Sequence, residues 1–397
     1  MHGEEQVTYF AQTNFRNDRR RFGIRRRDRR AHMYLIGKTG TGKSTLLQNL
    51  VQQDIQNGEG LALLDPHGDL IEKLLSTIPE HRKKDLIYFN VPDPENALSF
   101  NPLEGVLPAK RPLVAAGLLE VFKKIWTDSW GTRLEHILRN ALLTLLDQPD
   151  ATIADILRLL DDDGYRRTAL ARVGNPQVRR FWIQEYENFP GRYRTDAAAP
   201  IQNKVGAFLA DPIMNRILTQ SKSSFDLRRT MDERKILLVN LAKGKIGEGP
   251  AALLGALLVS QLGSAGLSRA DIPERARRDF YLYLDEFQTF TTMSIANMLA
   301  ELRKYRVNLI LANQYLSQVD RQVEDAIMGN VGTLVSFRVG PRDADFLAKE
   351  FSPQFKGLDL VNLPNFSIYL RLMIDGAVSP PFSAATLAPI EGEKSFR

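Results

Sequence analysis

The stretch that most constrains this chain is residues 37–44, which read Gly-Lys-Thr-Gly-Thr-Gly-Lys-Ser and follow a short apolar run at 32–36. The spacing G-x-x-x-x-G-K-[ST] is that of a phosphate-binding loop, in which glycines let backbone N–H groups converge on a polyphosphate. The apolar run predicts a strand, and Leu46 and Leu47 begin a helix whose positive N-terminal end would face the phosphates. The stretch therefore predicts a nucleotide-binding α/β fold.

The residue types in this loop predict how a nucleotide and its metal ion would be held. Lys43 would reach the outer phosphates, and the Ser44 hydroxyl would be a ligand for Mg²⁺. We therefore expect ATP and Mg²⁺ as cofactors. The predicted nucleotide-binding residues are Gly37, Lys38, Thr39, Gly40, Thr41, Gly42, Lys43, Ser44 and Thr45.

A second apolar run, at 280–284, ends in the two carboxylates of Asp285 and Glu286. A buried strand that ends in two acids suits a Walker B site. Asp285 would hold Mg²⁺, usually through water, and Glu286 would polarise the attacking water as general base. Adjacent acids after an apolar run are common, so this interpretation depends on their following the phosphate loop in the expected order.

The composition is that of a globular protein with more than one lobe. The chain has 397 residues, of which 43% are hydrophobic and 25% charged. The absence of cysteine excludes disulfides and thiolate metal sites and suits a reducing compartment. The histidines show no metal-ligand spacing, so we expect no zinc site.

We expect no membrane-spanning segment in this sequence. Uncharged apolar runs of about 18 residues are absent, and the closest stretch, 251–267, contains Ser260 and Gln261. Its length and small residues favour a buried core helix. The N-terminus also does not resemble a signal peptide, because its arginines are followed by the strand of the phosphate loop.

Positive charge is concentrated in residues 16–30, which contain nine arginines against two aspartates. This segment carries +7, so the rest of the chain, with a total of +6, sums to −1. Such a patch is drawn to nucleic-acid phosphates or to an anionic membrane, and Arg25, Arg26 and Arg27 are the candidate DNA contacts. The alternatives are a solvated arm, or a basic strap that pairs with acids on its own or a neighbouring subunit.

Apolar runs rich in branched residues alternate with helical patterns along most of the chain. Helical patterns lie at 44–54, 250–268 and 294–305, and Asp375-Gly376 predicts a hairpin turn. This alternation is typical of an α/β fold with a parallel sheet. The expected strands are 34–36, 61–64, 86–89, 236–239, 280–284, 309–312, 333–337 and 368–373.

The interval 102–229 differs, because it carries amphipathic helical periodicity and few strand signals. It contains Trp126, Trp130 and Trp182, which we interpret as core anchors of an all-helical lobe. The alternative is base stacking on single-stranded nucleic acid. The expected parts are a basic N-terminal segment at 1–30, a first part of the core at 31–101, an inserted all-α domain at 102–229 and a second part of the core at 230–397.

Two further motifs lie at the ends of expected strands. The turn at 65–69, Asp-Pro-His-Gly-Asp, could bring Asp65 or His67 to the metal and its water, or it could serve as a turn alone. The strand at 309–312 delivers Asn313 and Gln314, and a neutral amide there can sense a terminal phosphate by hydrogen bonding.

Three basic residues precede that strand, at or just after a helix end: Arg303, Lys304 and Arg306. In an oligomer, one of these arginines can complete a neighbour's site as an arginine finger. The alternative is a solvated cation, because helix C-termini attract positive charge in any case.

Taken together, these residues resemble the HerA/FtsK superfamily of RecA-like hexameric motors. The resemblance is to the coupling ATPases of type IV secretion and conjugative DNA transfer, including the TraG/TraD type. The helical interval also lies where coupling proteins insert an all-α domain between their Walker motifs. The matching elements are 37–44, 65–69, the strand that ends in Asp-Glu-Phe-Gln at 285–288, and Ala-Asn-Gln at 312–314.

The resemblance implies a RecA-like P-loop NTPase core with a mostly parallel sheet and an inserted all-α lobe. By matching position, Lys43 and Ser44 would bind phosphate and Mg²⁺, and Asp285 and Glu286 the metal and water. Gln314 would sense the γ-phosphate and Arg303 would be the finger, with Arg306 close by in the sequence.

The resemblance also implies partners and a location. The expected partners are DNA, further copies of the chain in a homohexameric ring, a relaxase and membrane components of type IV secretion. The expected location is the cytoplasm, at the cytoplasmic face of the inner membrane through those partners. One departure is that many coupling proteins have an N-terminal membrane anchor, whereas this chain opens with a polar, arginine-rich stretch.

We therefore expect an ATPase that forms a ring and translocates DNA. The alternatives are a motor that acts on protein substrates in a secretion apparatus, a HerA-like DNA-processing translocase, and a nucleotide-gated scaffold. Glu286 argues against the scaffold, which has no need of a catalytic base. The absence of an LSGGQ-like segment disfavours a transporter-type ABC ATPase.

Overall fold

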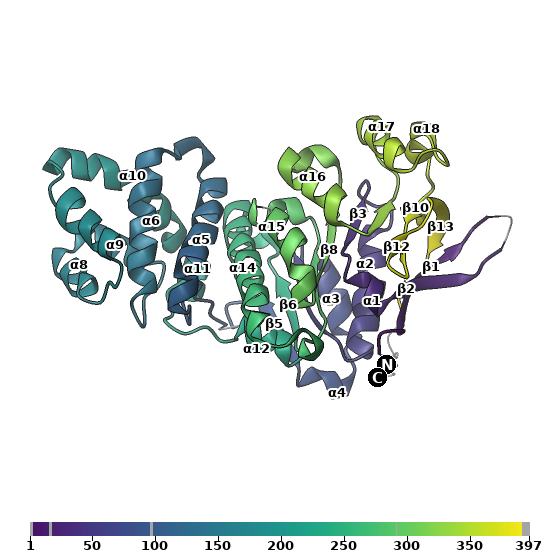
Figure 1. The fold of residues 1–397 in the computed structure, drawn as a ribbon, viewed down its shortest axis with the longest axis horizontal. Helices are drawn as coiled ribbons and strands as arrows, with labels where there is room; N and C mark the ends of the chain where they lie inside the picture. The colour runs from purple at the N-terminus through teal and green to yellow at the C-terminus, as the bar shows by residue number, and fades with distance from the viewer. Residues whose placement is uncertain (1–2, 16–17, 96–97, 291, 391–397) are drawn as a thin grey trace. The chain divides into compact units, whose positions relative to one another are not determined.

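The structure is a computed structural model that describes residues 3–15, 18–95, 98–290 and 292–390 (Figure 1). The chain forms two compact units, each built from separate stretches of sequence. The first comprises Met1–Asn90, Leu227–Ala242 and Ala265–Arg397, and the second comprises Val91–Asp226 and Lys243–Ser264. The second unit is therefore inserted into the first along the sequence, and it takes in a stretch beyond the interval 102–229.

The first unit is built on an eleven-stranded sheet in the order β2-β1-β13-β10-β9-β3-β8-β7-β4-β6-β5. The strand bounds are β1 Val7–Thr13, β2 Arg21–Arg25, β3 Met33–Ile36, β4 Gly60–Asp65, β5 Leu86–Asn90, β6 Ile236–Asn240, β7 Phe280–Leu284, β8 Val307–Asn313, β9 Thr333–Ser336, β10 Ser367–Arg371 and β13 Phe382–Thr386.

The strands from β9 to β5 in this order run parallel to one another. Every residue of β3, β4, β6, β7, β8 and β9 is buried. Parallel strands that are covered on both faces read as continuous apolar runs, which is why the sequence identifies this part of the sheet. The predicted α/β fold with a mostly parallel sheet is confirmed.

The other end of the sheet is antiparallel and contains strands that the sequence pattern did not predict. β10, β13, β1 and β2 pair antiparallel in that order. Phe10, Ala11 and Ile24 are buried in the same core as the parallel strands. Strands β1 and β2 are therefore part of the main sheet and not a separate basic segment, because some of their apolar side chains lie in its core.

A short hairpin follows β10, formed by β11 Met373–Ile374 and β12 Ala377–Val378. Asp375 and Gly376 form its turn, both with positive φ, at 52° and 79°. Two successive residues with positive φ are what a tight two-residue hairpin turn requires. The predicted hairpin turn is confirmed.

Helices pack on the sheet of the first unit (Figure 1). Helix α2 directly follows the glycine-rich loop and buries Leu46, Leu47, Leu50 and Val51, whose spacing gives one apolar face. The helix bounds are α1 Arg26–Arg29, α2 Lys43–Gln56, α3 Asp69–Leu75, α4 Glu80–Lys83, α12 Leu227–Asp232, α15 Ser294–Glu301, α16 Arg321–Asn330, α17 Pro341–Glu350 and α18 Gly357–Val361.

The second unit is helical in the residues that the structure describes. Trp126 and Trp182 are almost fully buried, and Trp182 donates a 2.8 Å hydrogen bond to the Thr144 hydroxyl, so both serve as core anchors. Its α-helices are α5 Arg111–Ile125, α6 Thr132–Leu146, α7 Asp155–Asp161, α8 Asp163–Leu170, α9 Pro176–Arg180, α10 Gly191–Ala210, α11 Pro212–Leu218, α13 Lys243–Ile246 and most of α14 Glu248–Ser268.

Helix α14 is long and apolar enough to cross a membrane, judged by length and composition alone. The helical stretch Glu248–Asp271 contains an 18-residue window with a mean hydropathy of 1.5, and 67% of that window is buried inside the protein. The core helices of soluble proteins pass the same test, so this burial agrees with the buried core helix expected from the sequence.

Candidate nucleotide-binding site

The ends of four parallel strands form the site. β3 pairs with β8, β8 with β7, and β7 with β4, and all four end at the same edge of the sheet. A cavity of about 380 Å³ lies there. It is lined by Thr39, Gly40, Gly42, Lys43, Ser44, Thr45, Gln48, Asp65, His67, Asp69, Leu70, Lys73, Asp285, Glu286, Gln314 and Phe366.

The glycine-rich loop needs glycine where its backbone turns into helix α2. Gly42 precedes this helix with φ at 120°, a conformation that side chains with a Cβ rarely adopt. A Cβ at this position would lie 2.9 Å from Cδ1 of Phe366 and 3.1 Å from Cε1 of Phe337. The close packing of these two rings therefore explains the last glycine of the motif.

Lys43 lies inside the curl of the loop and is only 7% exposed. Its Nζ donates hydrogen bonds to the carbonyl oxygens of Gly37 and Lys38, the latter at 3.1 Å. Burial lowers the pKa of Lys43, and the charges of Asp285 and Glu286 act in the opposite direction. Neutral carbonyls thus hold a desolvated cation, which an incoming phosphate would stabilise further.

Ser44 and Asp285 face each other, with Ser44 Oγ 3.5 Å from Oδ2 of Asp285. Burial raises the pKa of Asp285 to about 6, the neighbouring Asp65 adds to the rise, and Lys43 opposes it. A hydroxyl and a buried carboxylate are hard oxygen donors of the kind that Mg²⁺ binds together with phosphate oxygens. These two side chains therefore fit the predicted metal position.

The side chains alone would not make a complete metal cage. Within the described residues, no group of three or more His, Cys, Asp or Glu side chains is arranged to hold a metal ion. Mg²⁺ in nucleotide sites typically takes one or two protein oxygens and completes its shell with phosphates and water. The arrangement at Ser44 and Asp285 suits an ion that arrives with a nucleotide.

Glu286 is held by residues from two other strand ends. Gln314 Nε2 donates a 2.6 Å hydrogen bond to Glu286 Oε1, and His67 Nε2 lies 3.0 Å from Glu286 Oε2. Its backbone is left-handed, with φ at 43° and ψ at 50°, which is uncommon for a residue other than glycine. The structure thus brings the predicted base and the predicted sensor into direct contact.

The turn at 65–69 is fixed by hydrogen bonds to its first residue, Asp65. The Asp65 carboxylate accepts hydrogen bonds from the backbone N–H groups of His67 and Leu70, both at 2.9 Å, and so fixes the start of α3. The turn needs Gly68, because a Cβ there would lie 2.3 Å from Oδ1 of Asn240. Asp65 therefore shapes the turn, while His67 reaches the predicted base.

Arg303 lies at the opposite edge of the sheet from this cavity. It is exposed in the 3₁₀ turn Leu302–Tyr305, directly before the start of β8, whereas Gln314 follows the end of β8. A seven-residue strand spans about 20 Å. Arg303 therefore cannot reach the phosphate loop of its own chain, and a role at a neighbour's site stays a prediction.

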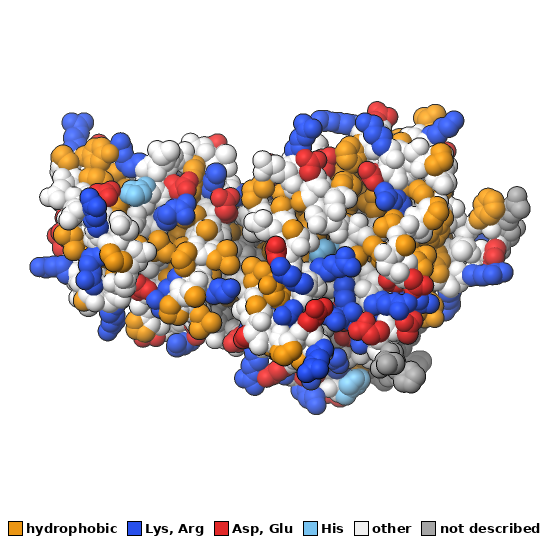
Figure 2. Space-filling model, in the orientation of Figure 1, with side chains coloured by type: hydrophobic (Ala, Val, Ile, Leu, Met, Phe, Trp, Pro, Cys, Tyr) orange, Lys and Arg blue, Asp and Glu red, His pale blue; other side chains and the backbone are white. Residues whose placement is uncertain are grey.

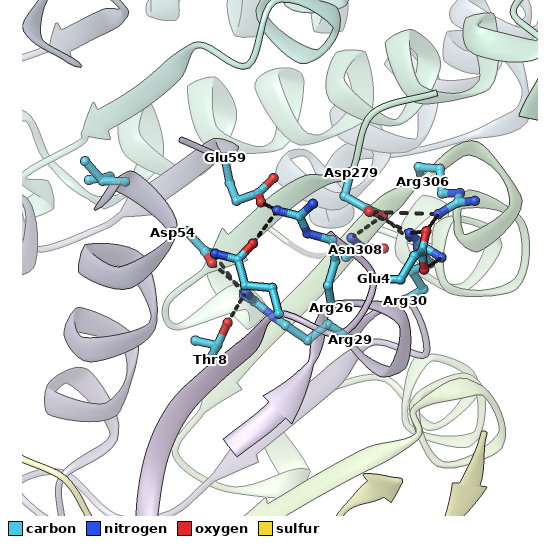
Figure 3. Close-up of polar contacts among 12 residues, drawn as sticks. Glu4, Thr8, Arg26, Arg29, Arg30, Asp54, Glu59, Asp279, Arg306 and Asn308 are labelled. Carbon is cyan, nitrogen blue, oxygen red and sulfur yellow. Dashed lines mark hydrogen bonds and ion pairs between the residues drawn. The ribbon is translucent and has the colours of Figure 1, made fainter. Parts of the chain in front are cut away.

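Arg306 is less suited to such a role, because its own chain engages its side chain. Its Nη1 lies 3.6 Å from a carboxylate oxygen of Glu4 and 3.9 Å from one of Asp279, and the side chain is only 16% exposed (Figure 3).

The candidate DNA contacts Arg25, Arg26 and Arg27 all form ion pairs within the chain. Arg25 and Arg27 each pair with both Glu5 and Asp375. Arg26 pairs with the buried carboxylate of Glu59 (Figure 3). Among the sequence alternatives, the basic strap that pairs with acids of its own subunit describes these contacts.

The next two arginines along this segment, Arg29 and Arg30, also pair with acids of the same unit (Figure 3). Arg29 makes a two-pronged contact with Asp54 of α2, and its Nη2 donates a 2.7 Å hydrogen bond to the Tyr283 hydroxyl on β7. Arg30 pairs in the same manner with Asp279. These contacts tie the N-terminal segment to the helix after the phosphate loop and to the strand before Asp285.

Positive and negative side chains are also mixed on the surface of the protein (Figure 2). On the face drawn in Figure 2, the Lys and Arg side chains of the described residues are interspersed with Asp and Glu over both units. The local charge of +7 in the sequence is therefore partly balanced by acids that are distant along the chain.

Sequence reasoning missed Phe366, which lines the cavity and contacts the phosphate loop. It lies outside the four motifs found in the sequence, in the turn before β10. The sequence contains a weak signal, Pro364-Asn365, which marks a turn. The position of that turn against the phosphate loop depends on the sheet order, which the sequence pattern does not reveal.

A family model described as the type IV secretion-system coupling protein DNA-binding domain matches residues 22–353. A search of curated protein sequences found no significant match.

Solved structures show the same fold at low sequence identity. The unbound bacterial conjugative coupling protein TrwBdeltaN70 is 17% identical, with a TM-score of 0.63 over 93% of this chain and 87% of its own. Plasmid coupling protein TrwB in complex with ADP and Mg²⁺ is also 17% identical, with a TM-score of 0.63 over 99% and 91%.

VirB4 of Thermoanaerobacter pseudethanolicus is 13% identical, with a TM-score of 0.65 over 99% of this chain and 98% of its own. These likenesses confirm the predicted fold of a RecA-like P-loop NTPase. Because the family model covers most of the sequence, this chain belongs to the family of type IV secretion-system coupling protein DNA-binding domains.

Proposed function

We propose that this protein is an ATP-hydrolysing motor that forms a ring and moves DNA during conjugative or type IV secretion DNA transfer. The observation that carries the proposal is the arrangement around Glu286. This carboxylate is fixed by His67 and Gln314 in the cavity that also contains Lys43 and Asp285. A site that only binds nucleotide needs no carboxylate held in this way.

The residues of the chain divide the chemistry between them. Lys43 would exchange the carbonyls of Gly37 and Lys38 for phosphate oxygens, which satisfies its charge better. Mg²⁺, when bound with the nucleotide at Ser44 and Asp285, would supply charge neutralisation on the phosphates.

The ionised Glu286 carboxylate would accept a hydrogen bond from the attacking water. It would then take the proton of that water as the water attacks. Gln314 and His67 hold one oxygen of this carboxylate each, so its orientation is fixed before the water arrives. The Gln314 amide would also release Glu286 and donate its hydrogen bond to the terminal phosphate when a nucleotide is bound. This change of partner would link the nucleotide state to the end of β8.

The test is ATPase activity with and without duplex and single-stranded DNA. Glu286→Gln should retain ATP binding and lose a factor on the order of 10² to 10⁴ in hydrolysis. Glu301→Gln, at an exposed position on α15, is the matched control and should hydrolyse ATP normally. Near-normal turnover in Glu286→Gln would remove it from the base role, and activity that ignores DNA would favour a protein substrate.

We further propose that the active sites are shared between neighbouring subunits of a homohexamer. Arg303 is exposed and lies far from its own phosphate loop, which leaves it available to a neighbour's site. Arginine fingers increase turnover by about 10³ to 10⁵ where they have been measured. DNA, a relaxase and membrane components of type IV secretion are the proposed partners, and the cytoplasmic face of the inner membrane is the proposed location.

Mixed rings test this sharing. Arg303→Ala subunits keep the phosphate loop, and Lys43→Ala subunits keep the finger, so some mixed interfaces would combine an intact copy of each and regain activity. Lys304→Ala, also exposed, is the control and should not impair the ring. If mixed rings form and stay as inactive as their components, Arg303 does not act in trans.

A further inference from the structure

Phe366 is a large apolar side chain that stays 49% exposed in the wall of the nucleotide cavity. Its backbone N–H donates a 2.8 Å hydrogen bond to the carbonyl of Thr41 in the phosphate loop. Its ring packs so closely on Gly42 that no side chain fits there. Phe366 is therefore attached to the phosphate loop by its backbone while much of its ring remains open to the cavity.

The backbone of Phe366 is left-handed, with φ at 64°, which is an outlier for a bulky residue. The structure holds this conformation from both sides, because the N–H of Thr386 donates a 2.8 Å hydrogen bond to the Phe366 carbonyl. The preceding Asn365 accepts a 2.9 Å hydrogen bond from Arg338. Strained and firmly held residues cluster at functional sites, where a side chain must be presented in one place.

The order of the strands in the sheet indicates how a bound nucleotide would be oriented in the cavity. The predicted metal ligand, base and sensor follow β7 and β8, which lie on one side of β3 and its phosphate loop. Phe366 precedes β10, which lies on the other side, beyond β9. A nucleotide whose terminal phosphate points toward Glu286 and Gln314 therefore has its nucleoside directed away from them, on the side where Phe366 lies.

We propose that Phe366 is the platform on which the nucleobase stacks. A phenyl ring offers an apolar face and no hydrogen-bonding group, so it recognises the flat area of a base and not its edge. The site would accept adenine and guanine nucleotides alike, with affinity supplied by stacking at one end and by the phosphate loop at the other. The inference rests on nucleotide binding at this loop, which is part of the proposed function.

Calorimetric titration with two probes separates the base from the phosphates. Mg-ADP carries both, whereas Mg-tripolyphosphate carries phosphates alone. Removal of a stacking aromatic side chain weakens base binding by about 5- to 150-fold. We expect Phe366→Ala to lose affinity for Mg-ADP in this range and to keep its affinity for Mg-tripolyphosphate.

Two further variants separate the ring from the backbone strain. Phe366→Gly suits the left-handed conformation and removes the ring, so it should lose Mg-ADP affinity as Phe366→Ala does. Phe366→Trp keeps a stacking surface and should retain Mg-ADP binding. Leu358→Ala, which removes an apolar side chain that is 75% exposed on α18, is the matched control and should bind both probes normally.

The outcomes distinguish this inference from the function on which it rests. Unchanged Mg-ADP affinity in Phe366→Gly would overturn the stacking role, and so would an equal loss of affinity for both probes. An equal loss accompanied by a lower solution mass would instead assign the ring to a contact between subunits. Failure of the unaltered protein to bind Mg-tripolyphosphate would contradict the phosphate loop and the proposed function themselves.

Discussion

Lys43 and Arg29 are both buried cations, but the structure satisfies them in opposite ways. Among the described residues, the hydrogen bonds of the Lys43 ammonium go to backbone carbonyls of its own loop, and burial lowers its pKa. Arg29 makes a two-pronged contact with the carboxylate of Asp54, and its pKa is raised well above the ordinary value despite the opposing effect of burial. Within the part of the chain that the structure describes, Lys43 has no carboxylate in ion-pair contact, whereas Arg29 is paired with one.

The type of partner distinguishes a cation that binds a ligand from a cation that stabilises the fold, whereas positive charge alone does not. A cation that is to bind phosphate is kept desolvated without an ion pair, so that the ligand supplies the anion. A structural arginine is most secure when its own chain supplies the carboxylate, because an unpaired buried charge is costly. The comparison explains why the arginine-rich N-terminal segment, despite its charge, lies among acids.

The largest expected effect comes from Lys43→Met. It should abolish nucleotide binding, because the loop would lose the only cation held inside it among the described residues. It should leave the free energy of unfolding of the ligand-free protein almost unchanged or slightly higher, since it removes a desolvated charge without breaking an ion pair. Urea unfolding and calorimetric titration of the same sample measure both. A large loss of stability would mean that Lys43 is also structural.

Arg29→Met should have the opposite pattern. It leaves Asp54 buried without its guanidinium partner, and removing one member of a buried pair costs about 3–5 kcal/mol. Folded protein should still bind nucleotide, because Arg29 is absent from the lining of the cavity. The double variant Arg29→Met with Asp54→Leu removes both charges and should recover part of the stability. If the double variant is as unstable as the sum of the single ones, the pair is not the cause.

His32 gives a smaller effect that depends on pH. It lies just before β3, with Nδ1 accepting a 3.0 Å hydrogen bond from Leu309 N–H and Nε2 donating a 3.1 Å bond to the Leu299 carbonyl. This arrangement fits the neutral ring. The pKa of His32 is lowered to about 4, mainly by burial, and the charge of Arg303 acts in the same direction.

The sign of the pH effect follows from proton binding. Between about pH 6.5 and pH 4, unfolded chains protonate His32 and folded chains do not, so stability falls as the pH falls through this window. The expected loss at this site is about 3 kcal/mol. Urea unfolding at pH 7 and pH 4.5 should show a smaller decrease in His32→Asn, because asparagine does not titrate and tolerates the left-handed backbone. Equal decreases in both proteins would exclude His32.

The sequence predicted the parts of this fold whose signal is local. Each of the seven parallel strands contains a continuous apolar run, and the phosphate loop, the acids after β7 and the amide after β8 each follow such a run. Strands β1, β2 and β13 are partly exposed and alternate irregularly, so their pattern is weak until the sheet forms around them.

The features that the sequence missed depend on long-range contacts. Glu5 and Asp375, which pair with Arg25 and Arg27, come from opposite ends of the chain. Phe366 reaches the phosphate loop only because β10 lies two strands from β3. A run of arginines or a turn before a strand does not indicate such partners.

The smallest expected effect concerns Arg25, Arg26 and Arg27. If all three contacted DNA phosphates, neutralising them would flatten the dependence of log affinity on log salt by about three. Because all three pair with carboxylates of their own chain, we expect the slope to change by less than about one. Replacing the exposed arginines at 19–21 is the matched comparison. They lie before or at the start of β2, so a DNA contact made by the β1–β2 hairpin would use them. A change near three for Arg25, Arg26 and Arg27 would show that DNA displaces their carboxylate partners, and the contrast between Lys43 and the arginines would then not hold.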